Sequence, residues 1–152
     1  MTGKQSLILK AGIVAGIMDG LGASLMYYIR TGKGPEGVFR YVASGALGDI
    51  ALTGSPALAL AGVVFHLIFA MIWAAIYVSF YPQIKKWISS WIVSGVLYAI
   101  VVWCFMNLVV IPLSRTPDTP VTVMGFVRGA SVLVFCIGLP IAGITRYQYW
   151  KE

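Results

Sequence analysis

The chain is poor in charge. Of its 152 residues, 11% are Asp, Glu, Lys or Arg, whereas soluble domains carry about 25%. Hydrophobic residues make up 59%, and a soluble protein of this size leaves too much surface exposed to hide that many apolar side chains from water. The composition therefore excludes an ordinary soluble domain and indicates side chains that face lipid.

Residues that carry catalytic or metal chemistry are also scarce. The chain has one histidine, His66, and two cysteines, Cys104 and Cys136, which lie inside apolar runs without metal-ligand spacing. No phosphate-binding loop, zinc-protease motif or nucleophile elbow is present. The sequence predicts no catalytic residue, no metal and no cofactor. A haem or redox protein, which would need a second ligand beside His66, is the least favoured alternative, together with a membrane enzyme.

The basic residues do not form a patch. The formal charge is +6, but Lys and Arg are scattered near the ends of the apolar runs, which argues against nucleic acid as a partner. Lys and Arg at such positions anchor helices at phospholipid headgroups. Membrane lipids are therefore the expected partners.

Four apolar segments are long enough to span a membrane, which takes about 20 residues in a helix. We expect an all-α integral membrane protein, a single domain over residues 1–152 that forms an antiparallel bundle of four transmembrane helices. The predicted spans are residues 7–29, 56–80, 88–111 and 122–145.

The connections differ in character. Residues 81–87 predict a tight turn in which Pro82 ends the second span. Residues 35–47 have helical apolar spacing after a Gly-Pro-Glu start, which indicates an amphipathic or re-entrant helix between the first two spans. Residues 112–120 hold three prolines and should be extended, without helix. Six basic residues fall on the side of both termini and four on the other, so both termini are expected in the cytoplasm.

Polar side chains inside a span are costly, and each is a candidate for function. Four stand out: Asp19, His66, Asn107 and Arg128. Counted along their helices at about 1.5 Å per residue, Asp19 and His66 lie near mid-bilayer, while Asn107 and Arg128 lie nearer one end. Their matched depths are compatible with one buried polar cluster.

Each of these residues has a structural and a functional interpretation. Asp19 could be a protonated acid that bonds across helices, or a group that responds to protons or cations. His66 could be a structural donor, or a proton sensor or ligand contact, since histidine changes charge near neutral pH. Asn107 could join helices or contact a solute. Arg128 could reach the headgroups, attract anions or pair with Asp19. Three aromatic residues complete the ligand-binding candidates: Trp73 and Tyr77, on the face of His66, and Trp103, on the face of Asn107.

A stripe of small residues marks the first span. Gly12, Gly16 and Gly20 recur every four residues, which lets another helix approach closely. Asp19 lies within about 20° of Gly12 on a helical wheel, so it should face protein. The stripe could pack inside one chain or join two copies, and a homodimer or larger homo-oligomer is possible on this ground.

Several stretches resemble the YagU-type small bacterial inner-membrane proteins. They are residues 65–70 (FHLIFA), 81–87 (YPQIKKW), 95–99 (GVLYA) and 112–117 (PLSRTP). An AGIVAG start at residues 11–16 and a VVWCFMNLVVIPLS run at residues 101–114 are similar to an uncharacterised Bacteroidetes-like set of these proteins. The resemblance implies a multi-pass location in the bacterial cytoplasmic membrane and a four-helix core. It implies no activity.

Two functions stay open. The polar residues at matched depth favour a channel- or carrier-like protein for a small solute or ion. The small number of these residues favours a structural protein, or one that binds a lipid or another hydrophobic ligand without transporting it.

Overall fold

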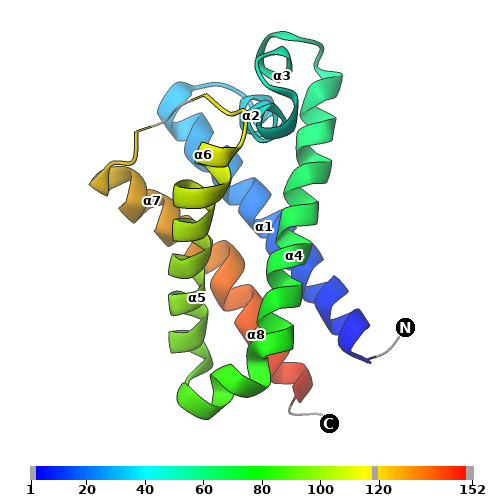
Figure 1. Cartoon of the computed structure of the whole chain (residues 1–152), viewed down its shortest axis with the longest axis vertical. Coiled ribbons are helices and arrows are strands. Elements are labelled where there is room, and N and C mark those ends of the chain that lie inside the picture. Colours follow the sequence, from blue (N-terminus) through cyan, green and yellow to red (C-terminus); the bar gives the residue numbers. More distant parts are fainter. Residues whose placement is uncertain (1–2, 118–119, 150–152) are drawn as a thin grey trace.

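The computed structural model of the chain describes residues 3–117 and 120–149 (Figure 1). All regular elements in these ranges are helical. Four helical runs are long and apolar enough to cross a membrane: α1 (Gly3–Thr31), α4 (Ala57–Trp87), Trp91–Leu113 and Val123–Tyr149. The prediction of an all-α four-helix bundle is confirmed, and the four apolar helices make the chain a multi-span membrane protein.

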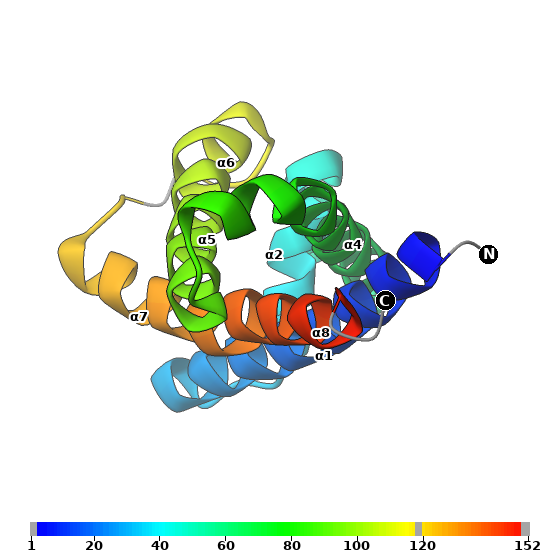
Figure 2. The ribbon, with the colours of Figure 1, turned by 90° about the horizontal axis from the view of Figure 1, so that it is seen from below.

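The helices form two crossed layers (Figures 1 and 2). In one layer, α1 lies beside the fourth run, which consists of α7 (Val123–Leu133), η2 (Val134–Gly138) and α8 (Leu139–Tyr149). In the other, α4 and α5 (Trp91–Phe105) run antiparallel. The layers meet where α1 crosses α4 and where η2 and α8 cross α5.

Apolar side chains cover the outside of the bundle. Helical spacing puts Leu60, Val64, Ile68 and Met71 on the face of α4 opposite His66 and predicts that this face contacts lipid. Leu60 is exposed by 69%, Val64 by 54% and Ile68 by 48%. Met71, expected on the same face, instead contacts the backbone of α1 at Gly12. An apolar surface of this extent is unfavourable in water and fits a lipid environment.

The second span does not end at Pro82. The helix continues through this proline to Trp87, so the prediction of a turn at residues 81–87 is wrong. A proline removes one hydrogen bond from the turn before it, but the turns on either side hold, and Lys85 and Lys86 lie in the last turn, where positive charge is favoured. The chain turns at Ile88, and Ser90 begins α5 by accepting a hydrogen bond from the Val93 amide.

Two prolines inside the later spans follow π-helical segments. The segment η1 (Met106–Val110) precedes Pro112, and η2 precedes Pro140. In each case the residue before the proline donates to the carbonyl five residues back: Ile111 to Met106, and Leu139 to Val134. Each segment thus widens the helix just before a proline that cannot donate. Pro112 itself lies in α6 (Ile111–Leu113), so the expectation of no helix from residue 112 onward is wrong for its first residues.

The predicted amphipathic helix is present as α2 (Glu36–Leu47), followed by the short α3 (Ile50–Thr53). Figure 1 shows α2 nearly end-on at the top of the bundle, and Figure 2 shows it lying across that end between α4 and α5. Arg40 ties α2 to α3 through a 3.1 Å bond from Nη1 to the Leu52 carbonyl. We call this the α2 end of the bundle.

The first and last described residues lie at the opposite end. Gly3 and Tyr149 line the same small surface pocket, and the turn between α4 and α5 lies at this end too. This arrangement agrees with four spans whose termini share a side. Which side of the membrane they face stays a prediction.

Candidate functional site: a carboxyl–imidazole pair at the α1–α4 crossing

The glycine stripe of α1 is the seam between α1 and α4. A Cβ at Gly16 would lie 2.9 Å from Leu67 Cδ2 and 3.0 Å from Ala70 Cβ, both on α4. A Cβ at Gly20 would lie 3.4 Å from His66 Nε2. Because the stripe is covered by α4 of the same chain, it is not open to a second copy. The close approach of the two helices brings polar groups into contact that longer side chains would hold apart.

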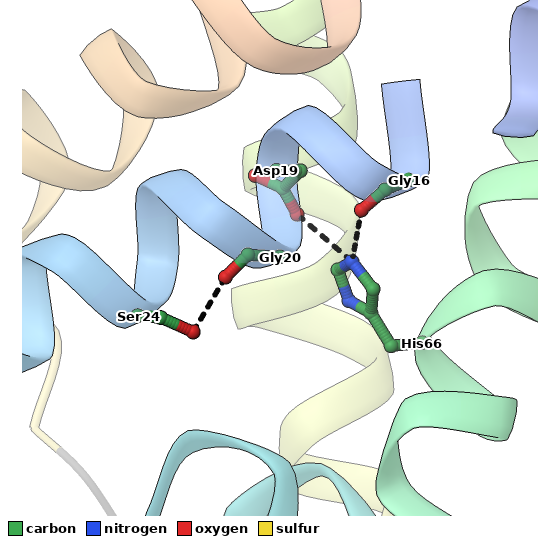
Figure 3. A network of polar contacts seen from close by, with 5 residues as sticks. All are labelled: Gly16, Asp19, Gly20, Ser24 and His66. Atoms are coloured by element: carbon green, nitrogen blue, oxygen red, sulfur yellow. Dashed lines mark hydrogen bonds and ion pairs between the residues drawn. The ribbon is translucent and has the colours of Figure 1, made fainter. Parts of the chain in front are cut away.

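Asp19 and His66 meet at this crossing (Figure 3). His66 Nε2 lies 2.9 Å from the carbonyl oxygen of Gly16 and 3.8 Å from Asp19 Oδ2. One turn further along α1, the Ser24 hydroxyl donates to the Gly20 carbonyl at 2.6 Å. Of the four polar candidates, these two are brought together in one pair, at similar positions along the crossing helices.

The contact with Gly16 decides where the histidine holds its hydrogen. A backbone carbonyl can only accept, so Nε2 must carry a hydrogen to bond with Gly16. The neutral ring therefore has a free lone pair on Nδ1. Figure 3 shows this nitrogen on the side of the ring away from Gly16 and Asp19.

The pair is mostly enclosed. Side-chain exposure is 16% for His66 and 14% for Asp19. The ring of Phe39, on α2, stands edge-on to the imidazole with 6.0 Å between ring centroids. Within the layer of α1, Cys136 of η2 packs against Gly22, where a Cβ would lie 2.9 Å from its sulfur.

Asn107 and Arg128 lie outside this pair. The Asn107 amide donates to the Trp103 carbonyl in its own helix at 2.9 Å, which satisfies the backbone where η1 begins. Arg128 is exposed on α7, and within residues 3–117 and 120–149 no ion pair joins it to Asp19. The sequence could match depths along helices, but it could not tell which faces turn toward each other.

The three aromatic candidates lie away from this pair: Trp73 and Tyr77 between α4 and α5, and Trp103 between α5 and α7. Tyr77 is buried and its hydroxyl lies 2.8 Å from Ser94 Oγ. Trp73 packs edge-on against Tyr98, whose hydroxyl donates to the Trp73 carbonyl at 2.5 Å. Trp103 packs edge-on against a ring of α7, with 4.8 Å between centroids. Trp73, Tyr77 and Tyr98 therefore fill space between α4 and α5.

Two contributors to the site were not identified from the sequence. Phe39 was read only as part of an amphipathic helix, because nothing in its spacing says that the helix folds back over His66. The Gly16 carbonyl is a backbone group, and sequence patterns indicate side chains. The one available signal was the glycine itself, since a residue without a side chain exposes its carbonyl to a neighbouring helix.

The described residues contain no group of three or more His, Cys, Asp or Glu that could hold a metal ion. Comparison with known proteins gives no match: no family model, curated protein or solved structure is similar to the chain. The resemblance to YagU-type proteins therefore stays a prediction, and the function must be argued from the geometry.

Proposed function

We propose that this protein is a small channel- or carrier-like membrane protein in which Asp19 and His66 bind and release a proton. The observation that carries the proposal is the pairing of the only histidine with a carboxyl group where two membrane-spanning helices cross. Ionisable residues inside spans are rare, and they commonly form proton relays or ion pathways.

The charge balance of the pair supports this role. With an ionised Asp19 and a neutral His66, the pair has charge −1, and one added proton makes it neutral. The proton enters at Nδ1, because Nε2 is already a donor to Gly16. The positive ring then faces the carboxylate across 3.8 Å. From this state Nε2 can pass its hydrogen to Asp19, which leaves a neutral ring with its hydrogen on Nδ1.

The transfer has a direction because the two nitrogens lie on different edges of the ring. Nδ1 takes a proton from one side, and Nε2 delivers a different proton to the carboxyl group on the other. Return to the starting state requires Asp19 to release the proton it received, and the ring to carry its remaining hydrogen on Nε2 instead of Nδ1. A relay of this kind moves protons without a wide pore, which suits two helices that pack as closely as α1 and α4 do where they cross.

Proton flux into liposomes tests the proposal. Purified protein is reconstituted with a pH-sensitive dye inside the vesicles, and a potassium diffusion potential drives proton entry. The wild type should carry protons, while Asp19→Asn and His66→Gln should fall to the rate of protein-free vesicles. Gln keeps an N–H donor for the Gly16 carbonyl but cannot titrate.

The matched control is Ser94→Ala, which removes a buried hydroxyl from a different helix contact. It should keep the wild-type rate. Equal flux in all variants would show that the pair does not carry protons. A folded wild type without flux would refute the transport function itself.

A structural or hydrophobic-ligand-binding role is the second candidate, favoured by one observation. The indole N–H of Trp73 is buried and has no hydrogen-bond partner among the described residues. A lipid or another apolar ligand with an acceptor oxygen could fill that need. Native mass spectrometry of the wild type and Trp73→Phe tests this role, which predicts a bound molecule that only the wild type retains.

A further inference from the structure

The α2 helix lies directly on the helix that carries His66. A Cβ at Gly62 of α4 would clash with the backbone carbonyl of Phe39, so α2 touches α4 backbone to backbone, one turn before His66. On the other side, Gly37 lies against the Tyr27 ring of α1. The helix therefore bridges α1 and α4 at the α2 end of their crossing.

Phe39 points from α2 to the carboxyl–imidazole pair. Its ring stands edge-on to His66, and its Cζ atom lies 3.5 Å from where a Gly20 Cβ would be. The ring thus sits between α1 and α4, next to the imidazole. Nδ1, to which the proposed function assigns proton exchange, is on the edge of the ring turned away from Asp19 and Gly16 (Figure 3). Phe39 is thus a side chain of α2 that packs directly on the imidazole.

The joints at the two ends of α2 are glycines. Within the described residues, positive φ occurs only at Gly32 (68°) and Gly48 (67°), and these two bracket the segment that contains α2. Glycine adopts this conformation without the strain that a side chain would add. Between Gly32 and α2, Gly34 has open space where a side chain would be. The helix is thus a unit joined to its neighbours by backbone that can change direction.

We propose that α2 is a movable cover, and that Phe39 controls the access of water and protons to His66 from the α2 end. This inference deepens the proposed function and depends on it for its role in transport. Whether α2 covers His66 can be tested by measuring the access of water to the imidazole, without measuring proton flux. In the closed position described here the phenyl ring lies beside the imidazole. Movement about the glycine joints withdraws it.

Access is measured with water itself as the probe. The C–H between the two nitrogens of an imidazole exchanges slowly in D₂O, and the chain has a single histidine, so mass spectrometry of one peptide reports it. A protein without an added histidine tag is used. The exchange is followed across pD, since a change in proton affinity moves the midpoint of the profile and a change in access moves its plateau.

An engineered disulfide, which can be reduced again, serves as a lock that holds α2 in place. A Cβ at Gly45 of α2 would lie 3.7 Å from Ser114 Cβ, within the range of about 3.5–4.5 Å that disulfides span. The double variant Gly45→Cys/Ser114→Cys is made with Cys104 and Cys136 replaced by Ala. The same protein with reductant is its own control, because only the disulfide differs.

The cover predicts a lower plateau exchange rate in the oxidised protein than in the reduced one. It predicts a higher plateau rate in Phe39→Ala. Phe126→Ala, which removes a ring that packs on Trp103 in another helix contact, should leave the rate unchanged. Equal rates with and without the disulfide, or equal rates in Phe39→Ala and Phe126→Ala, would overturn the proposal. So would a wild type whose histidine exchanges only after denaturation, because a movable cover must open.

Flux measured on the same variants separates the two proposals. If the exchange rate at His66 differs between the oxidised and reduced protein while no variant carries protons, the cover stands and the transport function fails. If proton flux requires Asp19 and His66 but neither flux nor exchange responds to the lock, the transport function stands and the cover is refuted.

Discussion

Two helix crossings in this bundle use the same packing device with different polar groups. Where α1 crosses α4, glycines bring the helices together around Asp19 and His66. Where α5 crosses η2, a Cβ at Gly95 would lie 2.9 Å from the Gly138 carbonyl. Beside that contact Tyr77 donates to Ser94, whose hydroxyl donates in turn to the Trp91 carbonyl at 3.0 Å.

The hydrogen bonds beside the second crossing join neutral groups only. Both of its hydroxyls are used as donors, and neither changes charge near neutral pH, so it can stabilise the bundle without responding to conditions. The first crossing keeps a carboxyl group and an imidazole with one nitrogen uncommitted. Close packing alone therefore does not mark a functional site. The presence of groups that can exchange protons distinguishes the first crossing from the second.

The largest loss of stability is expected from alanine substitutions of glycines at which the backbones of two helices touch. Gly62→Ala would push against Phe39, and Gly138→Ala against the Gly95 carbonyl. Because each clash is with backbone and not with the end of a flexible side chain, the variants must separate α2 from α4 or η2 from α5. Each variant should therefore lose about 1–3 kcal/mol of unfolding free energy, measured by denaturation in mixed detergent micelles. Gly34→Ala, where nothing lies within 4 Å, is the control and should be near wild type. An unaffected Gly138→Ala would show that the second crossing is looser than described.

The coupling between Asp19 and His66 should respond to pH differently from the coupling between Tyr77 of α4 and Ser94 of α5. Double-mutant cycles pair Asp19→Asn with His66→Gln, and Tyr77→Phe with Ser94→Ala. Hydrogen-bonded pairs in membrane helices contribute about 0.6 kcal/mol on average, and the hydroxyl pair should keep a constant value between about pH 5 and 8. The Asp19–His66 coupling should be stronger at the acidic end, because the ring attracts the carboxylate only when it carries a proton. A pH-independent Asp19–His66 coupling would mean that this pair is structural.

The sequence was sufficient for the features that depend on composition and periodicity. Long apolar runs predicted four spans, the four-residue spacing of Gly12, Gly16 and Gly20 predicted a close helix contact, and apolar spacing predicted a helix at residues 35–47. These features follow from what lipid and helix geometry require of each segment alone.

Features that depend on which faces meet could not be read from the sequence. Depth along the helices grouped Asp19, His66, Asn107 and Arg128, but the rotation of each helix keeps Asn107 and Arg128 away from the pair. Pro82 was read as a helix end because proline weakens the turn before it, yet the flanking turns hold the helix together. Phe39 lies beside His66 only because α2 folds back over α4.

The two π-helical segments offer the smallest and most local test. In η2, Ile137 and Gly138 are buried against neighbouring helices, whereas no residue of η1 is buried. Replacing Pro140 or Pro112 by Ala restores a backbone donor at each site. We expect η1 to become α-helical in Pro112→Ala and η2 to persist in Pro140→Ala. Stability should change by less than about 0.5 kcal/mol in either variant, and amide exchange reports the local hydrogen bonds.

We expect η2 and η1 to respond differently because η2 sets the register of the last span against α5. A π segment places one extra residue in a turn, so removing it from η2 would rotate everything after it relative to α5. That rotation would take Gly138 off Gly95 and turn Ile141, which is fully buried, toward the surface. Packing therefore holds η2 whether or not a proline follows, while no buried residue holds η1 in the same way. Loss of the π pattern at residues 134–138 in Pro140→Ala would show that the proline, rather than the second crossing, sets the register of the last span.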